Sequence, residues 1–145
     1  MVIRIIEKDE DYVKIADLIE EAKKNNRIDE AGAIFTFEGI VRGEEDNNKI
    51  KKLTLTTPDI DKSLKEIHEI VESVKTKFGV FDVSVIHYVG EFYTGDSLFL
   101  VCVLGNHRGE TLDALTDVIE RVKFDIDFKK EEISDNETKI IMSGG

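Results

Sequence analysis

The sequence predicts an α+β fold in which three helices accompany a mostly antiparallel sheet. Two pairs of strand-like segments, 31–42 with 50–56 and 83–89 with 97–104, follow each other with only a short polar or turn segment between them. Strands that follow each other without an intervening helix favour a largely antiparallel sheet, whereas parallel strands need a crossover of a dozen or more residues. Three amphipathic segments supply the helices, and no internal repeat or linker interrupts the chain.

Length and charge restrict the class of protein. A chain of 145 residues is long enough for a core of its own, so we expect one domain over residues 1–145. The formal net charge of −11 argues against binding to nucleic acid or to an anionic membrane. It still allows a small anionic substrate, because a few converging cations set the local field. With no signal-peptide pattern and no run of about 20 apolar residues, we expect a soluble, cytoplasmic protein.

The first third of the chain has mostly strand character. The expected elements are a strand over 2–6, a helix over 9–23, a strand over 31–42, a polar loop over 43–48 and a strand over 50–56. The strands contain β-branched and aromatic residues. The helix has apolar residues at helical spacing, acids in its first turn and lysines in its last. Gly32 and Gly39 mark a bend or bulge in the second strand.

The clearest helix signal begins at Thr57-Pro58 and ends at Gly79. A capping residue precedes a proline at the first helical position, one apolar stripe runs along the segment, and the glycine ends it. The remaining expected elements are a strand over 83–89, a turn region over 90–96, a central strand over 97–104, a helix containing the apolar positions of 112–122, and short strands over 128–133 and 138–142 split by a turn at 134–136.

The pair His107-Arg108 follows the most apolar strand and is a candidate for chemistry. Gly105 and Gly109 flank the pair and allow a ligand to approach the backbone closely. Arginine offers a planar donor fork to a phosphate or carboxylate, and histidine exchanges a proton near neutral pH. The alternative is a helix-capping turn in which both side chains face water.

Three lysines near the end of the chain are also candidates. Lys123 ends the third helix, where a cation is favourable to the helix dipole, and Asp125 and Asp127 offer it an ordinary exposed ion pair. Lys129 and Lys130 are neighbours in a short strand, and alternation sends them to opposite faces. One of the two therefore suits a pocket and the other suits solvent.

The other candidates have equally simple explanations. Arg42 ends an apolar strand, where it suits either an anion site or solvent, and Phe37 suits the core better than a stacking surface. Cys102 lies in an apolar run and is expected to behave as a small hydrophobe with an unactivated thiol. The three histidines lack metal-ligand spacing, and no phosphate-binding glycine loop or dinucleotide fingerprint is present. We therefore expect neither a metal nor a bound cofactor.

Several of these segments together carry a family resemblance. They are Ala31-Gly-Ala-Ile-Phe-Thr-Phe-Glu-Gly-Ile-Val-Arg42, Val85-Ile-His-Tyr-Val-Gly90, Gly95-Asp96, Gly105-Asn-His-Arg108 and the segment 123–131. In order and approximate separation they resemble the large, catalytic subunit of molybdopterin synthase. The resemblance extends from about residue 2 to about residue 133, and the combination is far more specific than any single segment.

The resemblance implies an α/β-hammerhead-type fold and a sulfurtransferase. It implies a homodimer that binds a small ubiquitin-like sulfur carrier at each end, forming a heterotetramer. The thiocarboxylate at the carrier's C-terminal Gly-Gly enters a pocket, and two sulfurs pass to cyclic pyranopterin monophosphate. The product is the dithiolene of molybdopterin, a step of molybdenum cofactor biosynthesis. Because sulfur arrives on the carrier, no catalytic cysteine is required.

The resemblance also assigns roles to individual residues. Lys123 and Lys130 match the two catalytic pocket lysines. The substrate-binding positions that match are Arg42, His107 and Arg108, as anion-binding and partner-protomer residues, and Phe37, as a pocket-lining residue.

The end of the chain departs from the family pattern. The longer C-terminal tail of the family is reduced here to residues 139–145, which leaves part of the partner-binding surface open to question. An alternative function is therefore a non-catalytic scaffold that binds the ubiquitin-like carrier. Gly144-Gly145 also copies the carrier's own terminus, which suggests the hypothesis that this tail enters a pocket.

Overall fold

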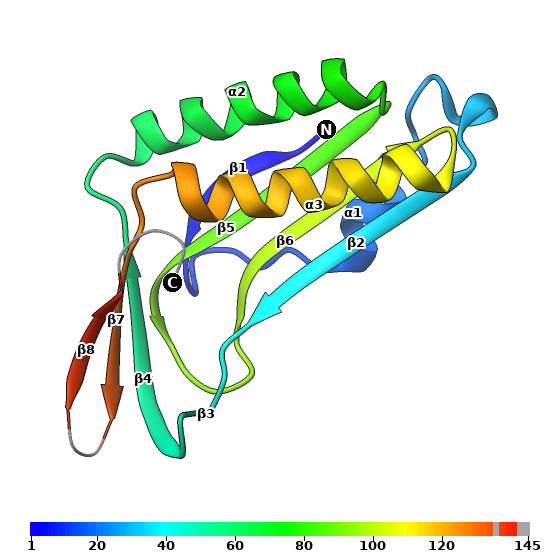
Figure 1. Cartoon of the computed structure of the whole chain (residues 1–145). Helices are drawn as coiled ribbons and strands as arrows, with labels where there is room; N and C mark the ends of the chain where they lie inside the picture. Colours follow the sequence, from blue (N-terminus) through cyan, green and yellow to red (C-terminus); the bar gives the residue numbers. More distant parts are fainter. Residues whose placement is uncertain (135–136, 142–145) are drawn as a thin grey trace.

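The computed structural model describes residues 1–134 and 137–141, without the side chain of Asn48 (Figure 1). In chain order its elements are β1 (Ile3–Glu7), α1 (Ile15–Ala22), the 3-10 turn η1 (Ile28–Glu30), β2 (Ala33–Ile40), β3 (Glu44–Glu45), β4 (Asn48–Thr56), α2 (Ile60–Phe78), β5 (Asp82–Phe92), β6 (Ser97–Gly105), α3 (Arg108–Asp125), β7 (Lys129–Ser134) and β8 (Thr138–Ile141). The predicted Gly144-Gly145 tail contact concerns residues outside the described part.

The eight described strands form one sheet in the order β2-β6-β5-β4-β7-β8, and every neighbouring pair along this path is antiparallel. Strand β1 joins β5 in parallel, and β3 pairs with β4. The prediction of an α+β fold with three helices and a mostly antiparallel sheet is confirmed. The expectation that 97–104 is a central strand is also confirmed, because β6 lies between β2 and β5.

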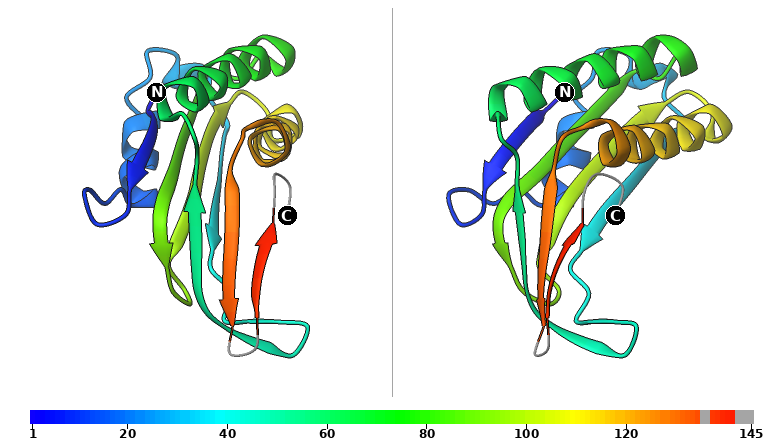
Figure 2. Two further views of the ribbon diagram at one scale, coloured as in Figure 1. Left: turned by 90° about the vertical axis from the view of Figure 1, so that its left-hand side faces the viewer. Right: turned by 60° about the vertical axis from the view of Figure 1, so that its left-hand side comes forward.

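Strand β5 connects the two parts of the sheet. Its residues 82–87 pair with β6, while its last three residues, 90–92, pair with β4. Helices α2 and α3 lie beside each other over one face of the β1-β5-β6-β2 part, with α1 on the other face (Figures 1 and 2). Strands β4, β7 and β8 extend from this body as an arm (Figure 2). The junction of body and arm lies at the C-terminal end of α3.

The core fills the space between the sheet and its helices. Strand β6 is buried almost throughout because helices cover both of its faces. Cys102 is 2% exposed, and its Sγ lies 3.8 Å from the Leu18 carbonyl oxygen of α1. Burial, followed by the charge of Asp82, raises the pKa of the Cys102 thiol to about 11. The interpretation of Cys102 as an unactivated hydrophobe is confirmed.

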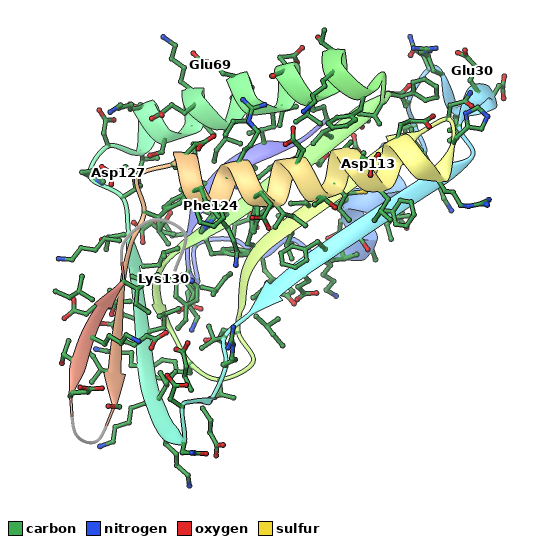
Figure 3. All side chains as sticks on the ribbon, in the orientation of Figure 1. Glu30, Glu69, Asp113, Phe124, Asp127 and Lys130 are labelled. Atoms are coloured by element: carbon green, nitrogen blue, oxygen red, sulfur yellow. The ribbon has the colours of Figure 1, made fainter. Side chains whose placement is uncertain are left out.

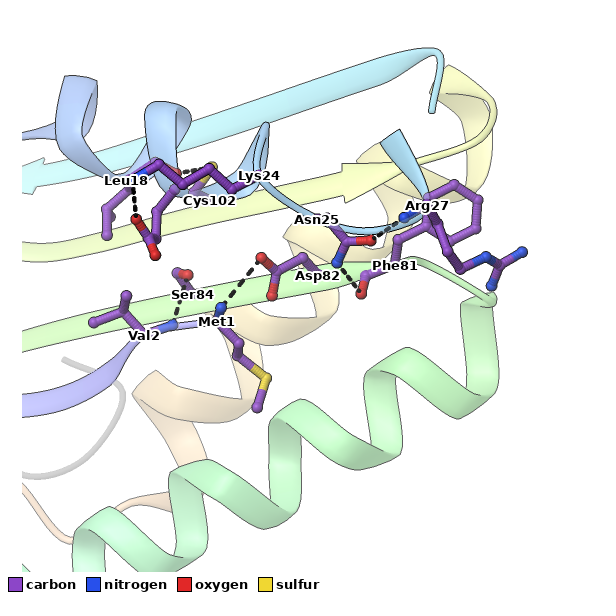
Figure 4. A network of polar contacts seen from close by, with 11 residues as sticks. Met1, Val2, Leu18, Lys24, Asn25, Arg27, Phe81, Asp82, Ser84 and Cys102 are labelled. Atoms are coloured by element: carbon purple, nitrogen blue, oxygen red, sulfur yellow. Dashed lines mark hydrogen bonds and ion pairs between the residues drawn. The ribbon is translucent and has the colours of Figure 1, made fainter. Parts of the chain in front are cut away.

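Polar contacts fasten β1 to β5 at its start. The Met1 amine lies 3.4 Å from Asp82 Oδ2, and the Val2 amide donates to Ser84 Oγ at 3.0 Å (Figure 4). Asp82 and Ser84 are both buried, so these contacts satisfy polar groups that burial would leave without water.

Helix α2 ends as predicted but begins two residues later. Gly79 ends it in the left-handed conformation, with φ of 68°. The capping residue is Asp59 rather than Thr57, because the Asp59 carboxylate accepts from the Lys62 amide at 3.1 Å. Thr57 instead makes a hydroxyl contact of 2.7 Å with Ser63. The prediction of Thr57-Pro58 as the helix start is therefore wrong by two residues.

Helix α1 is shorter than predicted. It begins at Ile15 rather than near residue 9, because Asp9 has a left-handed φ of 73° and the chain up to residue 14 is not helical. The Val13 amide donates to the Tyr88 hydroxyl at 2.9 Å, which holds this segment against β5. A tertiary hydrogen bond thus replaces the first turns that the sequence pattern suggested.

The predicted polar loop over 43–48 contains a tight hairpin. Asp46 and Asn47 both have positive φ, 51° and 65°, the conformation of a two-residue turn that joins antiparallel strands. Glu44 and Glu45 consequently pair with the first residues of β4. The bulge predicted at Gly39 is confirmed by a register shift between Gly39 and Ile40.

The remaining differences are small. The predicted turn region over 90–96 is shorter, since β5 continues to Phe92. The two final strands are confirmed, although Met142 and residues 135–136 lie outside the described part. None of the helices in the described part is both long enough and apolar enough to span a bilayer.

Candidate active site

A cavity of about 160 Å³ lies where the arm meets the body of the sheet. Its walls come from the end of β2, the start of β6, strands β3, β4, β5, β7 and β8, and the last turn of α3. Its ionisable lining residues are Arg42, Glu45, His87, Lys123, Lys130 and Glu132. In Figure 3, Lys130 on β7 lies next to the C-terminal end of α3. Although the chain is strongly acidic, three cations, Arg42, Lys123 and Lys130, therefore line one cavity.

Strand alternation decides which of the two adjacent lysines enters the cavity. Phe128, Lys130 and Glu132 are spaced two residues apart, and all three line the cavity. Lys129 is exposed, with its side chain on the opposite face of β7. Lys123 comes from the last turn of α3, the helix that precedes β7 in the chain. The structure thus brings Lys123 and Lys130 to one cavity from two different elements.

The charges of the cavity act on Lys130. Burial lowers the pKa of its ammonium most, the neighbouring cations Lys123 and Arg42 lower it further, and Glu132 and Glu45 act in the opposite direction. Both causes disfavour the charged ammonium. Binding of an anion between the three cations would relieve their repulsion.

Two carboxylates balance these cations at the rim. Burial raises the pKa of Glu132, and the nearby carboxylate of Glu45 raises it further by repulsion and hydrogen bonding. Both residues also line a second, smaller depression together with Ser134 and Lys139. The pair therefore lies where the cavity meets this depression, and Glu132 has an increased affinity for a proton.

His87 lies deeper, in the wall formed by β5. Its ring stacks on Phe128 with centroids 4.0 Å apart and an interplanar angle of 18°, and it lies 5.1 Å from the ring of Phe99. Its Nδ1 is 2.9 Å from the carbonyl oxygen of Tyr88. The residue is 7% exposed.

Burial lowers the pKa of His87 to about 4, and the charges of Lys130 and Lys123 contribute in the same direction. His87 is therefore neutral at neutral pH. The histidine spacing argued against a metal role for His87, which also stands in a segment that carries the family resemblance, but its place in the cavity was not predicted. The available signal was a histidine in the middle of an otherwise apolar strand.

Phe37 and Arg42 have different relations to the cavity. Arg42 follows the end of β2, lines the cavity and is exposed. Phe37 is half-buried on β2 and contacts Phe99 edge-on, with ring centroids 5.8 Å apart. Phe99 lines the cavity, whereas Phe37 is not among the lining residues and packs beside this part of the wall.

His107 and Arg108 lie at the opposite end of α3 and are exposed. The His107 amide donates to Glu110 Oε1 at 3.0 Å, and its ring Nδ1 lies 3.3 Å from the same oxygen. Because α3 contains 18 residues and rises about 1.5 Å per residue, about 25 Å separates this end from Lys123. Within one chain, His107 and Arg108 therefore do not join the lysines.

Comparison with known proteins decides the family. The family model described as "MoaE protein" matches residues 8–125, most of the chain. The chain belongs to the MoaE family. A relative from Salmonella typhimurium, the molybdopterin synthase catalytic subunit, is 35% identical over 105 residues, which are 72% of this chain and 69% of that protein. A Haloferax volcanii protein named probable molybdopterin synthase is 34% identical over 134 residues, 91% of this chain, and the chain spans about half of its length (51%).

Solved structures of this family share the fold. The crystal structure of molybdopterin synthase from Staphylococcus aureus superposes with a TM-score of 0.81 at 22% identity, covering 96% of both chains. A complex of subunits 1 and 2 of the molybdopterin-converting factor from Helicobacter pylori gives a TM-score of 0.70 at 24% identity, covering 97% of this chain and 89% of that chain. The architecture of the MoaE-family chain described above is thus that of molybdopterin synthase.

Proposed function

We propose that this chain is the catalytic subunit of a molybdopterin synthase. It takes sulfur from the thiocarboxylated Gly-Gly terminus of a small ubiquitin-like carrier and transfers it to cyclic pyranopterin monophosphate, in the biosynthesis of the molybdenum cofactor. The observation that carries this proposal is the convergence of Lys123, Lys130 and Arg42 on one cavity in a chain of the MoaE family. Its relatives named as catalytic subunits support the enzymatic role.

The chemistry of the cavity suits this reaction. A thiocarboxylate and a substrate phosphate are both anions, and three cations offer charge-assisted hydrogen bonds to them. A lysine ammonium also stabilises the oxyanion that forms when the acyl carbon of the carrier is attacked. The lowered pKa of Lys130 increases its neutral fraction, which is the form that accepts a proton or acts as a nucleophile. Phe128 and Phe99 add apolar wall for a flat heterocycle.

The proposal includes the assembly in which the chain acts. We propose a homodimer with a carrier bound at each end, a heterotetramer located in the cytoplasm. The Helicobacter pylori neighbour was solved as a complex of two subunits, which supports a carrier partner for this chain as well. His107 and Arg108 then belong to the active site of the partner protomer, because α3 keeps them far from the lysines of their own chain.

The test replaces each of the two adjacent lysines of β7 separately. The wild-type chain, Lys130→Ala and Lys129→Ala are each mixed with thiocarboxylated carrier and cyclic pyranopterin monophosphate, and molybdopterin is measured. We expect Lys130→Ala to lose about 100-fold or more in turnover, because a preorganised cation at a developing oxyanion is worth that much. Lys129→Ala is the matched control, and we expect it to retain wild-type turnover. Lys123→Ala should lose turnover in the same way while the fold survives.

Binding is measured alongside turnover. A wild-type chain that binds the carrier but forms no molybdopterin would identify the non-catalytic scaffold instead of the enzyme. Full turnover of both Lys123→Ala and Lys130→Ala would contradict the roles assigned to the lysines.

A further inference from the structure

We propose that His87 is the proton acceptor of the cavity: its Nε2 takes up a proton from the water that replaces sulfur on the carrier's acyl carbon. This inference rests on the proposed function and adds to it a residue that the lysine roles leave out. It follows from the tautomer that the protein imposes on His87, from the place of the ring among the cations, and from the chemistry that any thiocarboxylate donor requires.

A backbone hydrogen bond fixes the tautomer of His87. Nδ1 of His87 lies 2.9 Å from the backbone oxygen of Tyr88, and a carbonyl oxygen only accepts hydrogen bonds. In the neutral ring the proton therefore sits on Nδ1, and Nε2 carries the lone pair. Since the two nitrogens lie on different edges of the ring, bonding of Nδ1 to the strand leaves Nε2 for the cavity that His87 lines. The wall thus presents a neutral acceptor in a fixed orientation.

Packing against two aromatic rings holds the imidazole in that orientation. The ring lies between Phe128, stacked at 4.0 Å, and Phe99, tilted at 5.1 Å. Phe128 is 5% and Phe99 is 2% exposed, so neither ring has room to move aside. A base held in this way by packing and by one backbone bond is preorganised for proton transfer.

Charged groups near the ring influence whether His87 binds a proton. The charged groups that share the cavity with His87 are Lys123 from α3, Lys130 and Glu132 from β7, Arg42 after β2 and Glu45 from β3. Before an anionic ligand binds, burial and, to a smaller extent, the charges of Lys130 and Lys123 oppose protonation of His87 and keep it neutral. Anionic groups of the carrier and substrate neutralise these cations, which makes Nε2 more basic at the moment when a base is needed.

The proposed proton transfer accompanies hydrolysis of a thioester, in which every bond and proton is accounted for. Once the thiocarboxylate sulfur has bonded to the substrate, it links the acyl carbon of the carrier to the substrate as a thioester. Water then attacks the acyl carbon: an O–C bond forms, the C–S bond breaks, and its electron pair leaves with sulfur as a thiolate. The attacking water gives up one proton to Nε2 of His87, which later passes it to solvent, and the carboxylic acid that forms loses the second proton to solvent. The carrier ends as a carboxylate, and no oxidation or reduction takes place.

The carboxylates of the cavity are less suited to this step. Glu45 and Glu132 lie at the rim shared with the second depression, and the carboxylate of Glu45 raises the pKa of Glu132 further after burial. His87 lies in the wall against the rings of Phe99 and Phe128 and does not line that depression. The geometry therefore favours the imidazole.

The test compares three variants of His87 with a control, and one of them, His87→Ala, leaves room for added imidazole. His87→Asn keeps an amide donor for the Tyr88 carbonyl but has no basic Nε2, and His87→Phe keeps the ring packing without either nitrogen. His68→Gln is the control, because His68 is exposed on α2 and lies outside the cavity. Each chain is assembled with thiocarboxylated carrier and cyclic pyranopterin monophosphate. Carrier affinity, thermal unfolding and single-turnover release of carrier carboxylate are measured from about pH 6 to about pH 9.

We expect whichever His87 variant folds to bind the carrier like the wild type and to release carboxylate about 100-fold more slowly near pH 7. The deficit should shrink as pH rises, because hydroxide takes over from the missing base, and added imidazole should restore part of the rate of His87→Ala. A merely structural role would lower the rate equally at every pH and would not respond to imidazole.

Three results would overturn the inference. They are a release rate within about threefold of the wild type in a folded variant, a deficit that is independent of pH, and a failure of imidazole to rescue His87→Ala. If the wild-type chain itself forms no molybdopterin, the proposed function falls and this inference falls with it. If the wild type is active and the His87 variants match it, only the inference falls.

Discussion

Protonation of His87 in the folded chain would bury a cation away from water and close to two lysines. The pKa of His87 is therefore about 4 in the folded chain, against an ordinary value of 6.5. Below pH 6.5 the unfolded chain binds a proton that the folded chain refuses, so the free energy of unfolding falls as the pH drops from 6.5 to 4. A shift of this size corresponds to about 3 kcal/mol once both states are protonated.

This gives a prediction for stability that is independent of catalysis. Urea unfolding of the wild type between about pH 7 and about pH 4 should show a loss that His87→Asn lacks, amounting to about 3 kcal/mol. His68→Gln, at an exposed site, should follow the wild-type curve. Curves for wild type and His87→Asn that stay parallel over this range would show that His87 titrates normally in the folded chain.

At the residue scale, the sequence reached part of the cavity by two routes. Alternation along β7 predicted that one of Lys129 and Lys130 faces a pocket, and the family resemblance selected Lys130. The place of His87 was not predicted because it depends on contacts with Phe99 and Phe128. Both residues lie on other strands or segments, far from His87 in the sequence. Strand patterns report which face a residue occupies, but they do not report what the sheet brings to that face.

At the scale of elements, local signals placed the helix ends well where a single residue type decides them. Gly79 ends α2 because its φ of 68° is unfavourable for any residue with a Cβ. Local sequence signals failed where a tertiary contact determines the helix start. At Val13, the hydrogen bond to Tyr88 replaces the first turns that were expected for α1. The two-residue hairpin at Asp46-Asn47 was also missed, although two such residues in sequence are typical of this turn.

The Gly79 end of α2 gives the second stability prediction. Gly79→Ala should lower the free energy of unfolding by about 1 kcal/mol, because a Cβ is unfavourable in the left-handed conformation even where no neighbour lies within 4 Å. Gly109→Ala is the matched control: it also meets open space, but Gly109 is in the first turn of α3. That change should stabilise the chain by about 0.5 kcal/mol. Equal effects of the two changes in urea unfolding would contradict the conformational explanation.

At the scale of the whole molecule, helix α3 separates two sets of candidate residues. Its C-terminal end contributes Lys123 to the cavity, and its N-terminal end holds His107 and Arg108 about 25 Å away. The sequence order predicted both sets correctly as neighbours of α3, but a linear pattern does not say whether one chain or two complete a site. In a two-fold dimer, each site receives one end of α3 from each protomer if the helices cross the interface in opposite directions.

Mixed dimers test this arrangement. Lys130→Ala and Arg108→Ala chains should each be nearly inactive alone, but after unfolding and refolding together they should recover about a quarter of the wild-type turnover. With random pairing, half of the dimers are mixed, and each mixed dimer has one site with both defects and one site with neither. The control mixes Lys130→Ala with Lys123→Ala, whose defects lie in the same cavity of each chain. This mixture should recover nothing, because every site then lacks one lysine. Recovery in both mixtures, or in neither, would contradict a site that takes its lysines from one protomer and Arg108 from the other.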